Sequence, residues 1–212
     1  MPDLTPDREG AALLVIDVQN DFMPGGRLAV TDGAAVVPLI NQLGQRFEQV
    51  VITQDWHPAG HASFASSHPG CQPFERKQLP YGLQILWPDH CIQGSHGAQL
   101  HAELNLPHAQ SILRKGCNRH IDSYSAFIEA DRQTPTGLTG YLRERGISDL
   151  YLCGLALDYC VAWSALDARA AGFNTWVIVD ACRAIDLDGS GAAALVQMEA
   201  AGVRLIDAPA LG

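Results

Sequence analysis

The chain has few charged side chains and almost no lysine. Charged residues make up 17% of its 212 residues, and only two of the fourteen basic residues are lysines, Lys77 and Lys115. The formal net charge is -9, so nucleic acids and anionic membranes would be repelled at long range, and no local basic cluster reverses that field. We therefore expect neither nucleic acid nor a membrane as a partner.

Long hydrophobic runs and paired cysteines are also lacking. No stretch approaches the roughly 18 apolar residues that a membrane-spanning helix requires, and the first ten residues, MPDLTPDREG, contain no hydrophobic signal-peptide segment. We expect a cytoplasmic protein. The six cysteines form no CxxC pair, and in a chain long enough to bury a large core they are predicted to be reduced thiols.

Short hydrophobic runs recur along the chain instead. Those rich in Val, Ile and Leu predict strands at 11–17, 48–55, 111–116, 149–155, 174–180 and 203–207. Because these runs are continuous rather than alternating, both faces of each strand are expected to be covered, as in a mostly parallel sheet.

Helical patterns fall between the predicted strands. They cover 33–47, 136–145, 158–171 and 188–201. Gly146, Gly172 and Gly202 follow three of these helices as C-terminal caps. The sequence therefore predicts a doubly wound α/β fold, a three-layer sandwich of a six-stranded sheet with helices on both faces.

One long segment, residues 56–110, interrupts the alternation. It is rich in Pro, Gly and His and shows no clear strand or helix, and it holds seven of the eight histidines of the chain. Irregular segments of this length are uncommon inside a compact domain and usually carry function. We predict one domain over residues 1–212, with a functional loop at about 56–110.

Two motifs in and beside this loop indicate a metal site. In QDWHPAGH, Asp55 and His57 lie two residues apart at the end of a predicted strand, which directs both side chains to the same side. WPDHC supplies His90. Two imidazoles and a carboxylate leave open coordination positions and suit one divalent ion, with Zn²⁺ favoured and Fe²⁺ or Mn²⁺ as alternatives. His61 remains open as a fourth ligand, and the alternative is a surface loop whose histidines have no chemical role.

Reactive side chains follow the other predicted strands. Ligands of such sheets bind beyond the carboxyl ends of the strands, where Asp17, Lys115 and Cys160 lie. We expect Cys160 in the first turn of the 158–171 helix, with its pKa lowered by the helix N-terminus and by Lys115. Asp17 would take up the thiol proton and pass it to a leaving group. The alternative is that Cys160 is a buried, inert thiol.

Five segments together resemble the nicotinamidase branch of the isochorismatase-like cysteine hydrolases: LLVIDVQNDFMPGGRLAV, VVITQDWHPAGHASFA, WPDHCIQGSHGAQLH, LRKGCNRHIDSYSAF and YLCGLALDYCVAWSALDA. They occur in the order found in that family, and the resemblance extends from about residue 11 to 207. It implies a metal-dependent amide hydrolase that converts nicotinamide, and pyrazinamide-like amides, through a cysteine thioester to the acid and ammonia in NAD salvage.

The resemblance also implies roles for individual residues. The catalytic residues would be Asp17, Lys115 and Cys160, and the metal ligands Asp55, His57 and His90. The substrate-binding residues would be Phe22, Trp87, Tyr124 and Ala156. Phe22 and Trp87 would sandwich the pyridine ring. A cis peptide is expected between Leu155 and Ala156, and the amides of Ala156 and Cys160 would form the oxyanion hole.

Two other readings stay open at this point. One is a sister hydrolase acting on carbamoyl compounds or on isochorismate-type vinyl ethers, which is disfavoured because those branches generally lack the Asp55, His57 and His90 set. The other is a non-catalytic metal or redox sensor, which gives no reason for Asp17 and Lys115 to end separate strands. No interface pattern is readable, so a homo-oligomer is neither predicted nor excluded.

Overall fold

A six-stranded parallel sheet forms the centre of the molecule in the computed structural model, which describes residues 10–211. The strand order is β5-β2-β1-β6-β7-β8, and every neighbouring pair is parallel. The bounds are β1 Ala11–Ile16, β2 Gln49–Asp55, β5 Ser111–Lys115, β6 Asp149–Leu155, β7 Asn174–Arg183 and β8 Arg204–Ile206. All six predicted strands are confirmed. The predicted bounds of the domain, 1–212, extend beyond the described residues at both ends.

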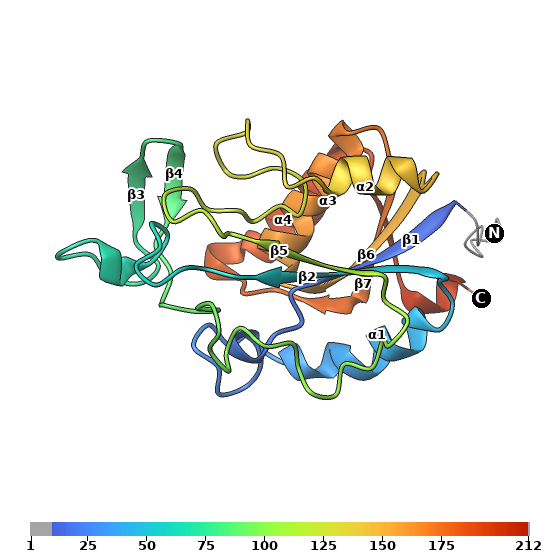
Figure 1. The fold of residues 1–212 in the computed structure, drawn as a ribbon, viewed down its shortest axis with the longest axis horizontal. Coiled ribbons are helices and arrows are strands. Elements are labelled where there is room, and N and C mark those ends of the chain that lie inside the picture. Colours follow the sequence, from blue (N-terminus) through green and yellow to red (C-terminus); the bar gives the residue numbers. More distant parts are fainter. Residues whose placement is uncertain (1–9, 212) are drawn as a thin grey trace.

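Four α-helices cover the two faces of the sheet. Figure 1 shows α1 on one face and α2, α3 and α4 on the other. Their bounds are α1 Val36–Gly44, α2 Leu138–Glu144, α3 Ala162–Ala170 and α4 Ser190–Ala200. Gly146, Gly172 and Gly202 have φ of 71°, 92° and 81°, the left-handed conformation that ends a helix readily only at glycine. The predicted three-layer sandwich and its C-terminal caps are therefore confirmed.

The strand order places a crevice between β1 and β6. From β1 the chain moves outward through β2 to β5, and it then returns to β6 on the other side of β1 and continues to β7 and β8. Side chains that follow β1 and β6 thus meet where the winding direction reverses, which is where open α/β sheets bind their ligands. The strand at this point lies in the core, because all six residues of β1 are buried.

The segment 56–110 is more regular than the sequence predicts. It contains a short 3₁₀ turn, Ala65–Ser67, and an antiparallel hairpin of β3 Arg76–Leu79 and β4 Gly82–Ile85, which stands apart from the main sheet (Figure 1). The prediction that it holds no strand is wrong because each strand has four residues and buries only one, Leu79 in β3 and Gln84 in β4. Neither strand therefore has the hydrophobic pattern that identifies one.

A second difference lies at Cys160. The predicted helix 158–171 begins instead with a π-helical turn, Leu157–Val161, and becomes α-helical only at Ala162. Cys160 therefore lies in a widened turn rather than in the first turn of an α-helix. Such turns are rare and occur frequently at functional sites.

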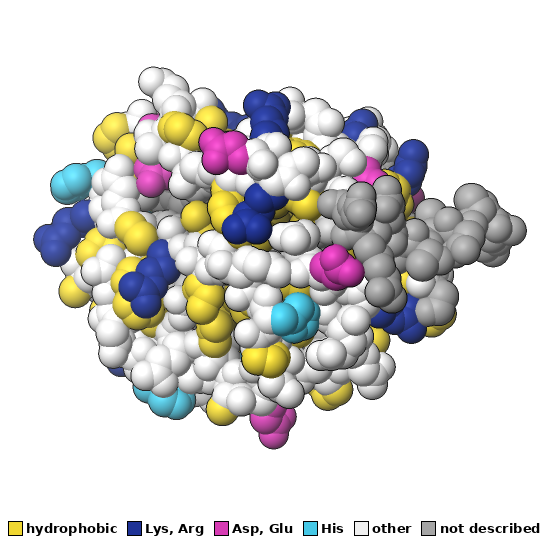
Figure 2. Space-filling model, turned by 45° about the vertical axis from the view of Figure 1, so that its right-hand side comes forward, with side chains coloured by type: hydrophobic (Ala, Val, Ile, Leu, Met, Phe, Trp, Pro, Cys, Tyr) yellow, Lys and Arg dark blue, Asp and Glu magenta, His cyan; other side chains and the backbone are white. Residues whose placement is uncertain are grey.

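Three further expectations concern cysteines, membranes and charge. All six cysteines are free, as predicted. No helix within residues 10–211 combines the length and hydrophobicity that crossing a bilayer requires. On the face shown in Figure 2, basic side chains are scattered among acidic and uncharged ones.

Candidate active site

Asp17, Lys115 and Cys160 meet at the carboxyl ends of β1, β5 and β6. Lys115 Nζ lies 2.8 Å from Asp17 Oδ2 and 3.3 Å from Cys160 Sγ, and it donates a further hydrogen bond of 3.0 Å to the carbonyl oxygen of Ser123. Asp17 is held by Thr53, whose hydroxyl donates to Oδ1 at 2.6 Å. Exposed fractions of 0%, 2% and 5% for Asp17, Lys115 and Cys160 show that the group is closed off from bulk water.

Charge within this group is set by burial and by two carboxylates. Burial opposes the charge on Lys115, but Asp17 and Asp55 outweigh it and hold its pKa well above the ordinary value. Burial raises the pKa of Asp17, although Lys115 acts against this. Lys115 is therefore a fixed cation, while Asp17 is a carboxylate that accepts a proton more readily than one in water.

The pKa of Cys160 is raised, whereas the sequence predicted that it would be lowered. Burial raises it well above the ordinary value, and Lys115 offsets only part of that effect while Asp17 and Asp55 add to it. The predicted lowering is wrong because the thiol lies in the interior beside two carboxylates, whose effect together with burial exceeds that of Lys115. The free thiol consequently retains its proton and needs a base to become a nucleophile.

Asp55, His57 and His90 form a ready set of metal ligands. Asp55 Oδ2 lies 3.6 Å from His57 Nε2 and 3.7 Å from His90 Nε2, and all three residues are buried. Nδ1 of His57 lies 3.0 Å from the Gly116 carbonyl oxygen, and Nδ1 of His90 lies 2.8 Å from that of Pro88.

The partners of these two rings decide which nitrogen atoms are available. A carbonyl oxygen only accepts hydrogen bonds, so each Nδ1 carries a proton, and each Nε2, which faces Asp55, is the atom that can bind a metal ion once it is deprotonated. This donor set, with a buried carboxylate between two oriented imidazoles, fits a divalent ion such as Zn²⁺.

A cavity opens next to both groups. Its lining contains Phe22, Leu28, Asp55, His57, Trp87, His90, Asp122, Tyr124, Ala156, Tyr159, Cys160 and Ile185. All four predicted substrate-binding residues are among them, whereas Asp17 and Lys115 lie behind the wall. Trp87 packs edge-on against Tyr159, with ring centroids 4.9 Å apart. The cavity is thus apolar and aromatic except where the thiol, the metal-ligand set and Asp122 reach it.

The predicted cis peptide between Leu155 and Ala156 is present. The carbonyl oxygen of Ala156 accepts hydrogen bonds of 3.1 Å from the amides of Tyr159 and Val161. Within residues 10–211, the amide of Ala156 itself donates to no acceptor. This N–H lies on a cavity residue beside Cys160 and is available to a bound ligand.

Comparison with known proteins identifies the family of this chain. The model of the isochorismatase domain matches residues 11–210. The chain belongs to the isochorismatase family. A curated nicotinamidase of Acinetobacter baylyi is 60% identical over 195 residues, which cover 92% of this chain and 91% of that protein.

Solved structures of family members superpose closely. A nicotinamidase and pyrazinamidase of Acinetobacter baumanii is 57% identical with a TM-score of 0.96, over 98% of this chain and all of that one. A pyrazinamidase of Pyrococcus horikoshii in complex with zinc is 32% identical with a TM-score of 0.76, over 93% of this chain and 98% of that one. The predicted family and fold are confirmed.

The sequence left open whether His61 is a fourth metal ligand. The structure places it beside the predicted metal-ligand set. Its ring centroid is 4.3 Å from that of His57, but its Nδ1 lies 2.7 Å from Ser63 Oγ and its Nε2 lies 3.3 Å from the carbonyl oxygen of Ile121. Burial lowers the pKa of His61 to about 4. A ring nitrogen of His61 lies close enough to His57 and Asp122 to share a metal ion with them. His61 does not belong to the group formed by Asp55, His57 and His90.

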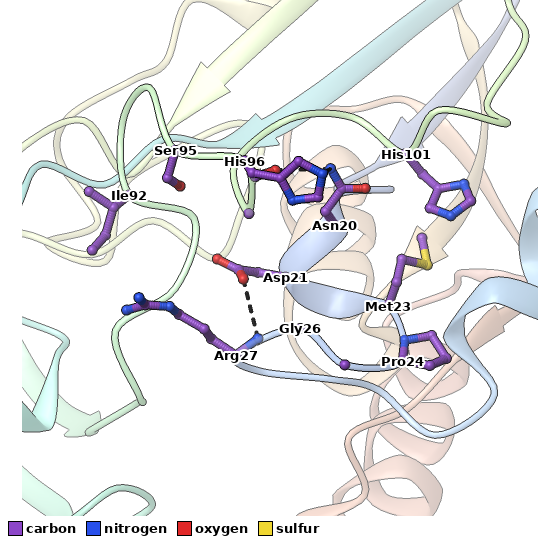
Figure 3. Close-up of a pocket in the computed structure, with 12 residues that line it drawn as sticks. Asn20, Asp21, Met23, Pro24, Gly26, Arg27, Ile92, Ser95, His96 and His101 are labelled. Carbon is purple, nitrogen blue, oxygen red and sulfur yellow. Dashed lines mark hydrogen bonds between the residues drawn. The ribbon is translucent and has the colours of Figure 1, made fainter.

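Two other loop histidines lie away from the active site of the isochorismatase domain. His96 and His101 border a wider hollow of about 560 Å³ beside the 3₁₀ turn Asn20–Phe22 (Figure 3). Asp21 also borders this hollow, and its carboxylate links two segments of the wall by accepting the amide protons of Arg27 at 3.2 Å and of Cys91 at 2.7 Å. The hollow contains no residue of the predicted triad or metal set.

The sequence did not identify four residues of the cavity wall, Leu28, Asp122, Tyr159 and Ile185. Tyr159 precedes Cys160 directly, so its position beside the nucleophile candidate was a usable signal. Leu28 and Ile185 come from irregular segments without periodicity, and nothing in the sequence distinguishes them from core residues.

Proposed function

We propose that the protein is a nicotinamidase, which hydrolyses nicotinamide to nicotinate and ammonia through a thioester on Cys160 and thereby serves NAD salvage. The observation that carries this proposal is the position of Lys115, whose Nζ is 3.3 Å from the thiol and hydrogen-bonded to the metal-ligand candidate Asp55. The names of the relatives from both Acinetobacter species support the substrate.

The cavity orients the substrate in this proposal. The pyridine ring enters between Phe22 and Trp87, and the carboxamide faces Cys160, so that the reacting atoms are held together before reaction. A divalent ion held by Asp55, His57 and His90, with Zn²⁺ as first choice, supplies an open coordination position for the pyridine nitrogen when bound. The zinc complex of the Pyrococcus relative supports that choice.

The first half-reaction forms the thioester. As Cys160 Sγ bonds to the carbonyl carbon, its proton passes to Asp17, whose raised pKa suits it to accept one. The resulting oxyanion is held by the amides of Ala156 and Cys160, and one such donor is worth roughly 3 kcal/mol. Asp17 then gives the proton to the amide nitrogen, the C–N bond breaks, and ammonia leaves. Lys115 keeps its charge throughout and neutralises the carboxylate.

The second half-reaction releases the acid. A water molecule gives a proton to Asp17 and attacks the thioester carbonyl, and the C–S bond breaks to form nicotinate. The proton on Asp17 returns to the departing sulfur, which restores the free thiol. Asp17 thus acts as base and as acid in each half.

A substrate panel tests this assignment. Ammonia release is measured with nicotinamide, with pyrazinamide and with an N-carbamoyl amino acid, before and after chelation of the metal. We expect turnover of the first two, lost on chelation and restored by Zn²⁺. Ammonia from the carbamoyl compound alone would assign the chain to a sister activity, and metal binding without turnover of any amide would favour a sensor.

A further inference from the structure

A buried carboxylate joins two separate parts of the cavity wall. Asp158 lies in the π-helical turn after β6, directly before the cavity residues Tyr159 and Cys160, and is 7% exposed. Its Oδ1 accepts the amide proton of Ile185 at 3.0 Å, and Ile185 lines the cavity as well. The side chain of Asp158 therefore connects the turn that carries the thiol to a wall residue from the loop between β7 and α4.

Two further donors fill the other oxygen atom of this carboxylate. Oδ2 accepts the amide proton of Asp186 at 2.8 Å and the hydroxyl proton of Ser190, the first residue of α4, at 2.5 Å. An ionised carboxylate only accepts hydrogen bonds, and a buried one is destabilising unless donors surround it. Because two of its three donors are consecutive backbone amides, Asp158 fixes the backbone of the loop at Ile185 and Asp186.

The loop has a conformation that needs such support. Asp186 and Asp188 have φ of 58° and 54°. Residues other than glycine adopt this left-handed conformation uncommonly, and it persists where the surrounding structure imposes it. Asp158 binds the amide of the first of these two residues. The position of Ile185, which directly precedes it, therefore depends on the carboxylate.

Ile185 lies where the cavity meets solvent. It is partly exposed, as is Tyr124, whereas the other lining residues are buried. An aliphatic side chain offers no hydrogen bond, so Ile185 can select among ligands only through its volume and its position. We propose that Asp158 is a positioning residue that holds Ile185 against the cavity and thereby limits the size of the aromatic ring that the site admits. The inference rests on the proposed function and refines its specificity.

Substituted substrates test the inference. We measure kcat/KM for nicotinamide and for its 2-, 4-, 5- and 6-methyl derivatives, and divide each derivative's value by that of nicotinamide. Ile185→Ala should raise this ratio about 10-fold or more for the isomer whose methyl group meets Ile185, the usual effect of one such group in a close-fitting pocket. Asp158→Asn should raise the ratio for the same isomer about 3- to 10-fold, because the amide replaces one acceptor and at least one bond to the loop is lost.

Asp167→Asn is the matched control. Asp167 is also 7% exposed, but its carboxylate pairs with Arg132 and does not contact the cavity loop. A purely structural effect lowers the amount of active protein and so reduces turnover of every amide by the same factor, which leaves the ratios unchanged. The double variant of Asp158→Asn and Ile185→Ala should match Ile185→Ala alone, because the carboxylate acts through that side chain.

Other outcomes overturn the inference. Unchanged ratios in Ile185→Ala would show that this side chain does not limit the substrate. A lower kcat for nicotinamide in Asp158→Asn with unchanged ratios would show that the carboxylate acts on the turn that carries Cys160. If Asp158→Asn fails to fold, as thermal unfolding would reveal, Ser190→Ala decides. It removes one donor from the same carboxylate and should raise the same ratio about threefold.

A binding measurement separates this inference from the proposed function. The affinity of the metal-loaded variants for the same amides is measured by calorimetry alongside turnover. Binding without hydrolysis would contradict only the proposed function, and weaker discrimination against the same isomer in Asp158→Asn, now in Kd, would still support the role of the carboxylate. Hydrolysis of nicotinamide with unchanged ratios in every variant would contradict only this inference. Absence of binding would contradict both.

Discussion

Lys115 and Asp55 join the proposed catalytic and metal-binding groups through a single carboxylate. Asp55 Oδ1 accepts a hydrogen bond of 2.5 Å from Lys115 Nζ, while Oδ2 faces both histidines of the metal set. A change at Asp55 therefore affects both groups, whereas a change at either histidine affects only one.

Substitutions at Asp55 and His57 should separate these effects. We expect His57→Ala to lower metal content and to raise KM strongly, with a modest change in kcat, because substrate orientation is lost. Asp55→Asn should also lower kcat by about 100-fold or more, since Lys115 loses one of its two carboxylates. Mass-spectrometric metal analysis and steady-state kinetics measure both. Unchanged metal content in His57→Ala would refute the ligand assignment.

The two lysines of the chain offer a matched comparison. Lys115→Met leaves the carboxylates of Asp17 and Asp55 buried without their cation, and removal of one partner from a buried ion pair typically costs about 3–5 kcal/mol. Lys77→Met, on the partly exposed hairpin strand β3, should change the free energy of unfolding by less than about 0.5 kcal/mol. Urea unfolding at pH 7 measures both.

The cost of Lys115→Met should depend on pH in a defined direction. Without the cation, the folded-state pKa values of both buried carboxylates rise, so protonation at lower pH stabilises the folded variant relative to its unfolded chain. The difference from the unsubstituted protein should therefore be smaller at pH 5 than at pH 7. A difference that grows as the pH falls would contradict the ion-pair account.

A third comparison concerns the nucleophile. Cys160→Ala should lower ammonia release from nicotinamide by at least about 10³-fold while the protein folds and keeps its metal, because only the attacking atom is lost. Cys117→Ser changes an exposed thiol two residues after Lys115 and should leave kcat within about twofold. Ammonia assays with both variants decide the point, and substantial turnover by Cys160→Ala would rule out the thioester.

Much of the fold and of the candidate site was predictable from the sequence, because these features depend on patterns among residues that are neighbours in the chain. Continuous apolar runs identified the six strands. Asp17 follows β1 and Lys115 ends β5, and they were predictable as neighbours in space because parallel strands end at one edge of the sheet. Asp55 and His57 were identified in the same way. The resemblance to a known family added Phe22 and Trp87.

The remaining features depend on tertiary packing, which local patterns do not encode. The polar β3–β4 hairpin has no hydrophobic period, so neither its strands nor the inward side chain of Gln84 was predicted. The direction of the Cys160 pKa was wrong because it is decided by burial and by Asp17 and Asp55, which approach from other strands. A helix N-terminus and a cation were visible in the sequence, but the desolvation of the thiol was not.

Buried thiols should also make the protein sensitive to alkali, and Cys182 offers the clearest case. Burial raises the pKa of Cys182 to about 12, from 9.0 in the unfolded chain. A group whose folded-state pKa is raised contributes stability that is fully present below pH 9 and is lost as the pH rises towards 12, because only the unfolded chain releases its proton in that interval. At about 1.4 kcal/mol per pKa unit, the loss from Cys182 reaches about 4 kcal/mol.

Cys182→Ala should therefore flatten the fall in unfolding free energy between pH 8.5 and pH 10.5, measured by urea denaturation under reducing conditions. Cys71→Ala removes a partly exposed thiol and is the control. Equal slopes for the two variants would show that the Cys182 thiol ionises as readily in the folded protein as in the unfolded chain.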